Sequence, residues 1–282
     1  MPLPFLASSA SWRSLRFLAL RSPLRALAFA QVTLQQQRGR DGVGAAFLFL
    51  AGKFHRAEGH FGGVAGQPFV GEVHGQSGSL GDPCAHWLDE EPSLVRVWDL
   101  APLLPDLTAI ADHVRGLHRM KAAPPDQSVR GGTQTDGHLL LRDDAPIRRL
   151  RAAIEQAVAA HIAQLAPEDM RHPTLAAPRG PFRFSGSWSV SLRDAGFHIP
   201  HTHSQGWISS ALYLALPDAQ PRQGWLKLGE PPADLGLDLP PSRWIEPAPG
   251  RLVLFPSTMW HGTEPFDAGE RLTVAFDVVP LI

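Results

Sequence analysis

The sequence predicts a mainly β fold with flanking helices, in which residues 182–282 form the core of a barrel or sandwich. Residues 184–192 alternate large apolar with small polar side chains, which is the period of a half-buried strand. Further short strand-like segments follow, and prolines separate them. No helical pattern lies between these segments, which favours strands joined by short turns over a parallel sheet with crossover helices.

Five strands are expected in this barrel core, at 184–192, 207–216, 224–228, 251–255 and 271–279. Residues 100–166 predict a helical support for the barrel. Its clearest helix has Asp143 or Asp144 as its cap, Pro146 in its first turn, and an apolar stripe from Ile147 to Leu165. We also expect a strand at 94–98, a helix at 107–120 and a loop at 127–135.

Residues 1–80 have a different composition from the rest of the chain. They carry eight Lys/Arg and three Asp/Glu, and the first forty residues hold six arginines and no acid. That composition is typical of an organellar transit peptide, and the alternative is an upstream extension with no selected fold. No helical or strand period persists there, so we expect low order and no chemistry. The sequence therefore predicts an N-terminal extension, 1–80, and one domain, 81–282.

Charge and cysteine content exclude several classes of site. Residues 81–282 are net acidic, with eighteen Lys/Arg against twenty-four Asp/Glu, which disfavours nucleic acid as a partner. The single cysteine, Cys84, excludes an internal disulfide and any multi-cysteine zinc or iron–sulfur site. It also fits a reducing cytoplasm. No run of eighteen apolar residues predicts a membrane span. The oligomeric state cannot be derived from these features.

Three histidines are the candidate metal ligands. His201 and His203 are two residues apart, so in an extended segment both side chains point the same way. His261 follows a strand and a tight turn, close to a strand edge. Imidazole is a common neutral ligand for iron, zinc, copper and nickel. A lone histidine is more often a surface or core residue, and the metal interpretation rests on the set of three with Arg271 ten positions after His261.

This pattern resembles the 2-oxoglutarate- and iron(II)-dependent oxygenases, and more narrowly their bacterial branch often joined to helical repeats. The resemblance covers roughly residues 82–282 and leaves out 1–80, where no helical repeat is found. Residues 127–135 also resemble that branch. The other matching motifs are Gly196-Phe197-His198 with His201-Thr202-His203, Gly206-Trp207-Ile208-Ser209-Ser210, Gly224-Trp225-Leu226-Lys227, Pro249-Gly250-Arg251-Leu252-Val253-Leu254-Phe255-Pro256, Trp260-His261-Gly262-Thr263 and Glu270-Arg271-Leu272-Thr273.

The resemblance implies a double-stranded β-helix, a jelly-roll or cupin-like barrel, that holds Fe(II) and uses 2-oxoglutarate and O2, with ascorbate as a stimulant. Arg271 would pair with the far carboxylate of 2-oxoglutarate, and Thr273 would add a hydroxyl contact. Tyr213, the only tyrosine, either binds the same carboxylate or is a core residue. Hydroxylation of a small-molecule or peptide substrate is the expected reaction. Nothing in the loops identifies that substrate.

The sequence departs from the family pattern at one ligand. Most of these oxygenases use two histidines and one carboxylate, whereas here the middle position holds His203. Three imidazoles leave the charge of the ion unneutralised, so iron should bind less tightly without 2-oxoglutarate than with it. Alternatively, Asp194 or Asp277 supplies a carboxylate ligand, and one of the histidines supports the ligands without binding the ion directly. His198 is expected to face away from the site.

Two other classes remain open. A cupin-type dioxygenase or isomerase also uses His-x-His with a distal histidine. It normally adds a glutamate soon after the pair, and residues 204–210 contain no acid. The other class is a catalytically inactive binding module on the same fold.

Overall fold

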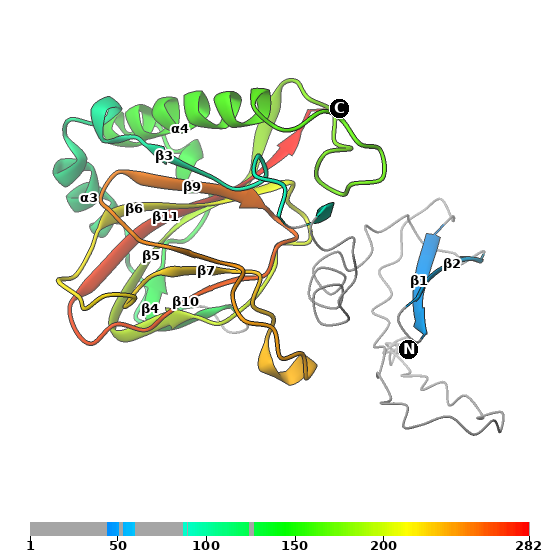
Figure 1. The fold of residues 1–282 in the computed structure, drawn as a ribbon. Coiled ribbons are helices and arrows are strands. Elements are labelled where there is room, and N and C mark those ends of the chain that lie inside the picture. Colours follow the sequence, from blue (N-terminus) through cyan, green and yellow to red (C-terminus); the bar gives the residue numbers. More distant parts are fainter. Residues whose placement is uncertain (1–43, 51–52, 60–86, 89, 124–126, 282) are drawn as a thin grey trace, which may run out of the picture.

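The structure is a computed structural model and describes residues 44–50, 53–59, 87–88, 90–123 and 127–281 (Figure 1). Within the predicted extension it describes one antiparallel pair, β1 (Gly44–Leu50) and β2 (Lys53–Gly59), where the sequence predicts no strand. The other residues of 1–80, and Cys84, lie outside the described part. No helix of the described residues is both long enough and apolar enough to cross a membrane.

Two antiparallel sheets build the main body of the protein. The larger sheet has six strands in the order β3-β9-β6-β11-β5-β4, and the smaller sheet has three in the order β10-β7-β8. The bounds are β3 Arg96–Asp99, β4 Val129–Gln134, β5 Phe182–His198, β6 Ile208–Ala215, β7 Leu226–Leu228, β8 Arg243–Ile245, β9 Arg251–Pro256, β10 His261–Thr263 and β11 Glu270–Pro280.

A backbone bridge near the histidines links the smaller sheet to the segment that follows β5. His201 forms an isolated antiparallel bridge with His261, the first residue of β10, through two backbone hydrogen bonds of 3.0 Å. The helices cover one face of the larger sheet, and the smaller sheet lies on its other side (Figure 1). This arrangement of two facing antiparallel sheets is a double-stranded β-helix, which confirms the predicted fold class.

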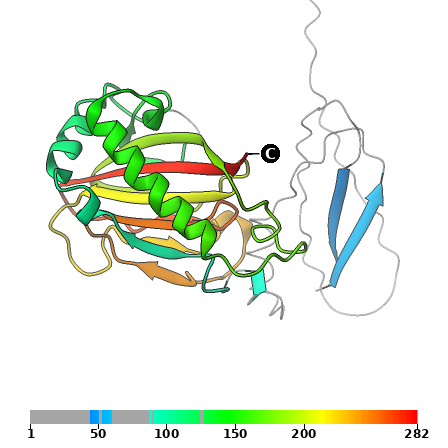
Figure 2. The same cartoon turned by 90° about the horizontal axis from the view of Figure 1, so that it is seen from above.

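Helices cover the outer face of the larger sheet. The long helix α4 (Ala145–Ala163) crosses this sheet obliquely, and α3 (Leu107–Arg115) lies beside it (Figure 2). Asp144 occupies the N-cap position of α4 and makes no side-chain capping bond, and Pro146 lies in the first turn as expected. Three short 3-10 helices complete the described elements: η1 Ala101–Leu103, η2 Leu139–Leu141 and η3 Ala233–Leu235.

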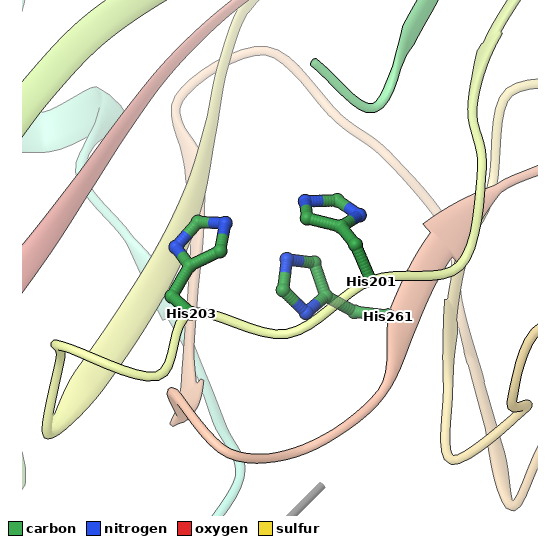
Figure 3. A group of neighbouring side chains, drawn as sticks. All are labelled: His201, His203 and His261. Atoms are coloured by element: carbon green, nitrogen blue, oxygen red, sulfur yellow. The ribbon is translucent and has the colours of Figure 1, made fainter. Parts of the chain in front are cut away.

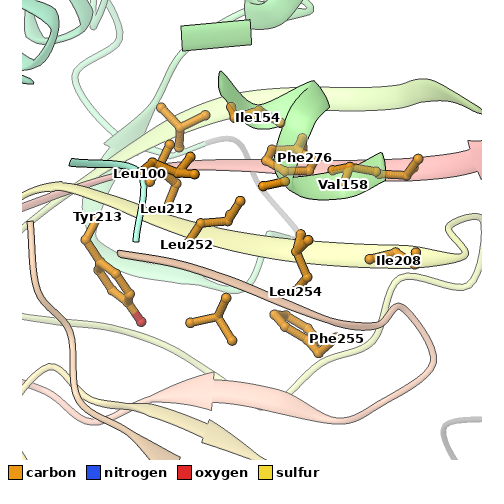
Figure 4. Close-up of a cluster of buried hydrophobic side chains, with 14 of the residues drawn as sticks. Leu100, Ile154, Val158, Ile208, Leu212, Tyr213, Leu252, Leu254, Phe255 and Phe276 are labelled. Atoms are coloured by element: carbon orange, nitrogen blue, oxygen red, sulfur yellow. The ribbon is translucent and has the colours of Figure 1, made fainter. Parts of the chain in front are cut away.

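The main hydrophobic core lies between α4 and the larger sheet. On β11, the side chains of Leu272, Val274, Phe276 and Val278 are fully buried on the face toward the helix. Ile154 and Val158 of α4 pack against this face beside Phe276 (Figure 4). Each such side chain contributes about 1.5–3 kcal/mol on burial, so this layer provides much of the stability of the barrel.

Four elements of the main body differ from the sequence prediction. Residues 129–134 form β4, the edge strand next to β5, where a loop is expected, and a register shift near Gly131 (φ +68°) explains the turn-like glycine pair. The strands β8 and β10 are only three residues long, too short for an alternating pattern. Helix α3 ends at Arg115, with Gly116 at the C-cap position, earlier than expected.

Candidate metal centre

The three predicted ligands converge at one point between the two sheets. His201 and His203 follow β5, and His261 begins β10 (Figure 3). One nitrogen of each ring lies within 4.8 Å of one nitrogen of the other two. The ring centroids are 4.1 Å apart for His201 and His261, 4.9 Å for His203 and His261, and 5.1 Å for His201 and His203.

Hydrogen bonds on the outer side of each ring orient it toward the cluster. The Nδ1 atom of His201 is 2.8 Å from Ile199 O, and that of His261 is 3.0 Å from Met259 O. A carbonyl oxygen only accepts, so both Nδ1 atoms carry the hydrogen and both Nε2 atoms keep a lone pair. His203 Nδ1 is 2.7 Å from the Asp277 carboxylate. All three rings can therefore offer Nε2 to a single ion, as metal-bound histidines commonly do.

Asp277 lies behind His203 and not within the cluster. Its Oδ1 also accepts a hydrogen bond from Ser209 Oγ at 2.6 Å, and Ser209 Oγ is 2.8 Å from Ser257 Oγ. Asp194 is exposed and accepts from Gly269 N at 3.1 Å. In the described residues, the group able to hold a metal contains the three histidines and neither carboxylate. The geometry thus favours a three-imidazole site in which Asp277 orients His203.

Burial keeps the imidazoles of His201 and His261 neutral. It lowers the pKa of His201 to about 4, with a further contribution from the neighbouring His203. Burial also holds the pKa of His261 well below its ordinary value, and the adjacent His201 and His203 act in the same direction. Rings that do not take up a proton at pH 7 keep their lone pairs available, so the donors present suit a divalent transition metal.

Arg271 provides the second half of the site. Its side chain is 2% exposed, and its guanidinium carbon lies 5.0 Å from the centre of the Tyr213 ring. None of the ion pairs among the described residues includes Arg271, and its Nε atom has no hydrogen-bond partner there. The hydroxyl of Tyr213, also fully buried, has none either. A buried cation without a counter-ion is costly, which indicates a site for an anionic ligand.

Strand register explains why these groups meet. Thr273 of β11 lies opposite Tyr213 of β6 and Val190 of β5, and Arg271 is two residues along the same strand. All four side chains therefore point to the inner face of the larger sheet. The Thr273 hydroxyl already donates to Val190 O, over 3.4 Å. Burial raises the pKa of Tyr213, and the charge of Arg271 opposes that rise, so the phenol is neutral at pH 7.

The structure corrects the expectation for His198 and adds an aromatic residue to the site. His198 does not face away: its ring stacks on that of His201, with centroids 5.9 Å apart and an interplanar angle of 21°. Trp207 donates its indole N–H to Thr174 O and belongs to the main core. The ring that lies beside His203 is Trp188, at 5.6 Å between centroids. Its inward position on β5 follows from the alternation of that strand.

A comparison with protein-family models matches the segment that contains this site. Residues 186–277 match the family model described as “Putative 2OG-Fe(II) oxygenase”. A comparison with curated proteins gave no match. Similar solved structures include the viral collagen prolyl hydroxylase of Paramecium Bursaria Chlorella virus-1 in its 2OG complex, with 13% identity, 66% of this chain and 95% of that chain covered, and a TM-score of 0.43. A prolyl-4-hydroxylase of Pseudomonas putida has 18% identity, 67% and 94% coverage, and a TM-score of 0.45.

The matched segment contains most of the site. It includes the three histidines, Arg271 and Asp277, and it ends at Asp277, the residue that orients His203. Residues 186–277 of this chain therefore match the 2OG-Fe(II) oxygenase family over the segment that carries the site, and the residues of that site fit an iron(II)- and 2-oxoglutarate-dependent dioxygenase.

Proposed function

We propose that His201, His203 and His261 hold Fe(II) through their Nε2 atoms, and that the two carboxylates of 2-oxoglutarate lie between this ion and Arg271. One observation supports the proposal above others. The interior of one barrel holds three imidazoles, each anchored by a hydrogen bond at Nδ1, and a buried guanidinium that forms no ion pair within the described part of the chain. A doubly negative cosubstrate would complement both, because it supplies the charge that three neutral ligands lack.

Arg271 would bind the far carboxylate of the cosubstrate through its planar fork of donors. Tyr213 would add its hydroxyl, which has no partner among the described residues. Thr273 is the weaker contributor, because its hydroxyl hydrogen is directed at Val190 O. The apolar side chains of Val190, Leu192 and Phe266, all buried around this region, would exclude water from the chelated acid.

When bound, iron(II) and 2-oxoglutarate supply the oxidising chemistry: O2 is consumed, 2-oxoglutarate loses CO2 to give succinate, and the substrate is hydroxylated. The chain itself orients these reactants. Met259 O and Ile199 O hold two ligand rings, and Asp277 holds the third. Asp277 also polarises His203 and makes it a better ligand.

A direct test is succinate release by the purified protein given iron(II), O2, 2-oxoglutarate and ascorbate, which we expect to stimulate. His261→Ala should abolish it. The cupin-type alternative, which does not use 2-oxoglutarate, is separated by thermal unfolding: in the presence of metal, 2-oxoglutarate should raise the Tm, because a ligand of the native state stabilises it. An unchanged Tm would favour the cupin type. Absence of bound iron after anaerobic reconstitution would favour an inactive module.

A cleft lined in part by Trp188, whose ring centroid lies 5.6 Å from that of His203, is the proposed place for the substrate. It measures about 330 Å³ and is lined by Trp188, Gln134 and Met120 together with residues 135–138 and 185–187. The lining contains one carboxylate, Asp136, and no lysine or arginine. We therefore propose a small-molecule or peptide substrate whose reacting group is neutral or cationic. Fragments that bind the manganese- and 2-oxoglutarate-loaded protein should lose affinity in Trp188→Ala; selective binding of phosphorylated fragments would contradict this.

The remaining assignments rest on the sequence. We propose a cytoplasmic protein, because a chain with one cysteine suits a reducing compartment. We also propose that residues 1–80 are separable from the oxygenase domain, 81–282, in which 100–166 support the barrel core 182–282. Expression of 81–282 alone should give the same Tm and the same iron content as the full chain. A large drop in either would show that the extension is part of the domain.

A further inference from the structure

Ser128 lies immediately before β4, beside the candidate metal centre, and its hydroxyl is shared between two imidazoles. Its Oγ is 3.2 Å from His201 Nε2 and 3.0 Å from His198 Nδ1. The backbone holds this arrangement in place. Ile199 N donates to Ser128 O at 3.0 Å, and His198 N donates to Thr263 Oγ1 at 2.9 Å. Ser128 is thus fixed next to the nitrogen that the proposed function assigns to the metal.

The hydrogen-bond partners show which atoms of His201, Ser128 and His198 carry a hydrogen. His201 Nδ1 carries its hydrogen, because it faces the carbonyl oxygen of Ile199. The Nε2 atom of His201 therefore has the lone pair, and the Ser128 hydroxyl donates to it. The Ser128 oxygen then accepts from the Nδ1–H of His198. Without metal, the hydrogen bonds run from His198 to Ser128 and from Ser128 to His201.

Metal binding at His201 Nε2 would remove the acceptor of the hydrogen bond that the Ser128 hydroxyl donates. The ion and the Ser128 hydroxyl compete for one lone pair, and coordination is the stronger interaction. The hydroxyl hydrogen then needs another acceptor, while His198 still donates to the oxygen. An anionic oxygen bound beside His201 is the best candidate, because charge-assisted hydrogen bonds are about twice as strong as neutral ones.

We propose that Ser128 donates a hydrogen bond to the metal-chelating carboxylate of 2-oxoglutarate, and that His198 positions the Ser128 hydroxyl for this contact. This inference rests on the proposed function. Ser128 would hold the end of the cosubstrate opposite to Arg271, so both ends of the diacid would have a dedicated donor. Successive donors in a chain polarise one another, so the His198 bond should strengthen the Ser128 bond.

The test compares metal and cosubstrate affinity in Ser128→Ala. Manganese(II) replaces iron so that no turnover occurs, and both affinities of the full-length protein are measured by calorimetry. We expect the affinity of the manganese-loaded variant for 2-oxoglutarate to fall by about tenfold to a hundredfold, as for loss of a hydrogen bond to a charged group. Its affinity for manganese alone should be unchanged or higher. Ser128→Thr, which keeps the hydroxyl, should restore cosubstrate binding.

Ser204→Ala is the matched control, because Ser204 is exposed and directly follows His203. Its affinities should equal those of the wild type. If Ser128→Ala binds 2-oxoglutarate within twofold of the wild type, or loses metal and cosubstrate affinity alike, the inference is wrong. If the wild type binds manganese but not 2-oxoglutarate, the proposed function itself fails, and this inference with it.

The role of His198 is tested by a double-mutant cycle. His198→Leu alone should weaken 2-oxoglutarate binding by roughly threefold to tenfold, less than Ser128→Ala, because it acts through the serine. In the Ser128→Ala background the same change should have no further effect. An equal loss in both backgrounds would show that His198 acts independently of Ser128 and would overturn the positioning role.

Discussion

The two faces of β11 contain very different side chains, although they alternate along one strand. The outer face presents Leu272, Val274, Phe276 and Val278 to the helical layer, all of them fully buried among apolar neighbours. The inner face presents Arg271, Thr273 and Asp277 to the barrel interior. The polar groups there are also largely buried, and the Nε atom of Arg271 has no hydrogen-bond partner among the described residues.

The outer face of β11 thus contributes mainly to stability, and its inner face contributes mainly to ligand binding. The outer face follows the ordinary rule that apolar side chains pack densely and stabilise the fold. The inner face breaks the rule that a buried charge is paired, and such exceptions are expected at functional sites. Substitutions on the outer face should therefore reduce the free energy of unfolding, and substitutions on the inner face should reduce binding.

The largest effect is expected from Phe276→Ala on the outer face. The side chain is fully buried and packs edge-to-face with Phe184 at 5.3 Å. Its removal leaves a cavity and should lower the free energy of unfolding by about 3–5 kcal/mol, measured by urea denaturation. The folded variant should keep its affinity for 2-oxoglutarate. A loss of binding without a loss of stability would contradict the division between the faces.

Arg271→Met is the matched change on the inner face. It removes a charge–carboxylate contact and should weaken 2-oxoglutarate binding by about 2–3 kcal/mol, or about 30- to 150-fold, with metal still bound. The free energy of unfolding should be unchanged or higher, because the change removes a buried cation that has no ion pair among the described residues. Calorimetry and urea denaturation of the same sample measure both quantities. Unfolding of this variant would assign Arg271 a structural role instead.

Asp277→Asn probes the inner face near the metal. The carboxylate orients His203, so its replacement should weaken iron or manganese binding by about 10- to 100-fold, measured by calorimetry without 2-oxoglutarate. Asp194→Asn is the control, because this exposed carboxylate lies outside the site. Equal metal affinity in the two variants would remove Asp277 from the site.

The smallest effect concerns His161, an imidazole in the outer layer. It is 1% exposed on α4, and burial, with the charge of Arg96 as a lesser cause, lowers its pKa to about 4. The unfolded chain, with a pKa near 6.5, binds the proton more readily, so stability is full above pH 6.5 and falls as the pH drops toward 4. Between pH 7 and pH 5, the free energy of unfolding should fall by on the order of 1–2 kcal/mol more in the wild type than in His161→Leu. Parallel pH curves for the two proteins would show that His161 does not titrate as described.

The sequence was sufficient for the barrel, the long helix and the convergence of three histidines, because period-two strands, a period-3.6 stripe and His-x-His spacing are local signals. It could not place β8 and β10, whose three residues are held by pairing with β7. It also misplaced His198, because its direction depends on tertiary contacts with Ser128 and Thr263. The choice between Asp194 and Asp277 needed strand register, which sets Asp277 opposite Ser209 near His203.

The backbone bridge between His201 and His261 has a consequence for the metal-free protein. Two of the three ligands are held at their positions by amide hydrogen bonds that need no ion, so the cavity is shaped before iron arrives. Small zinc domains differ, since their chains fold only when the metal binds. Removal of the metal by a chelator should therefore leave this barrel folded and able to bind iron again. Its iron content would then follow the cellular supply of metal and cosubstrate without cycles of unfolding and degradation.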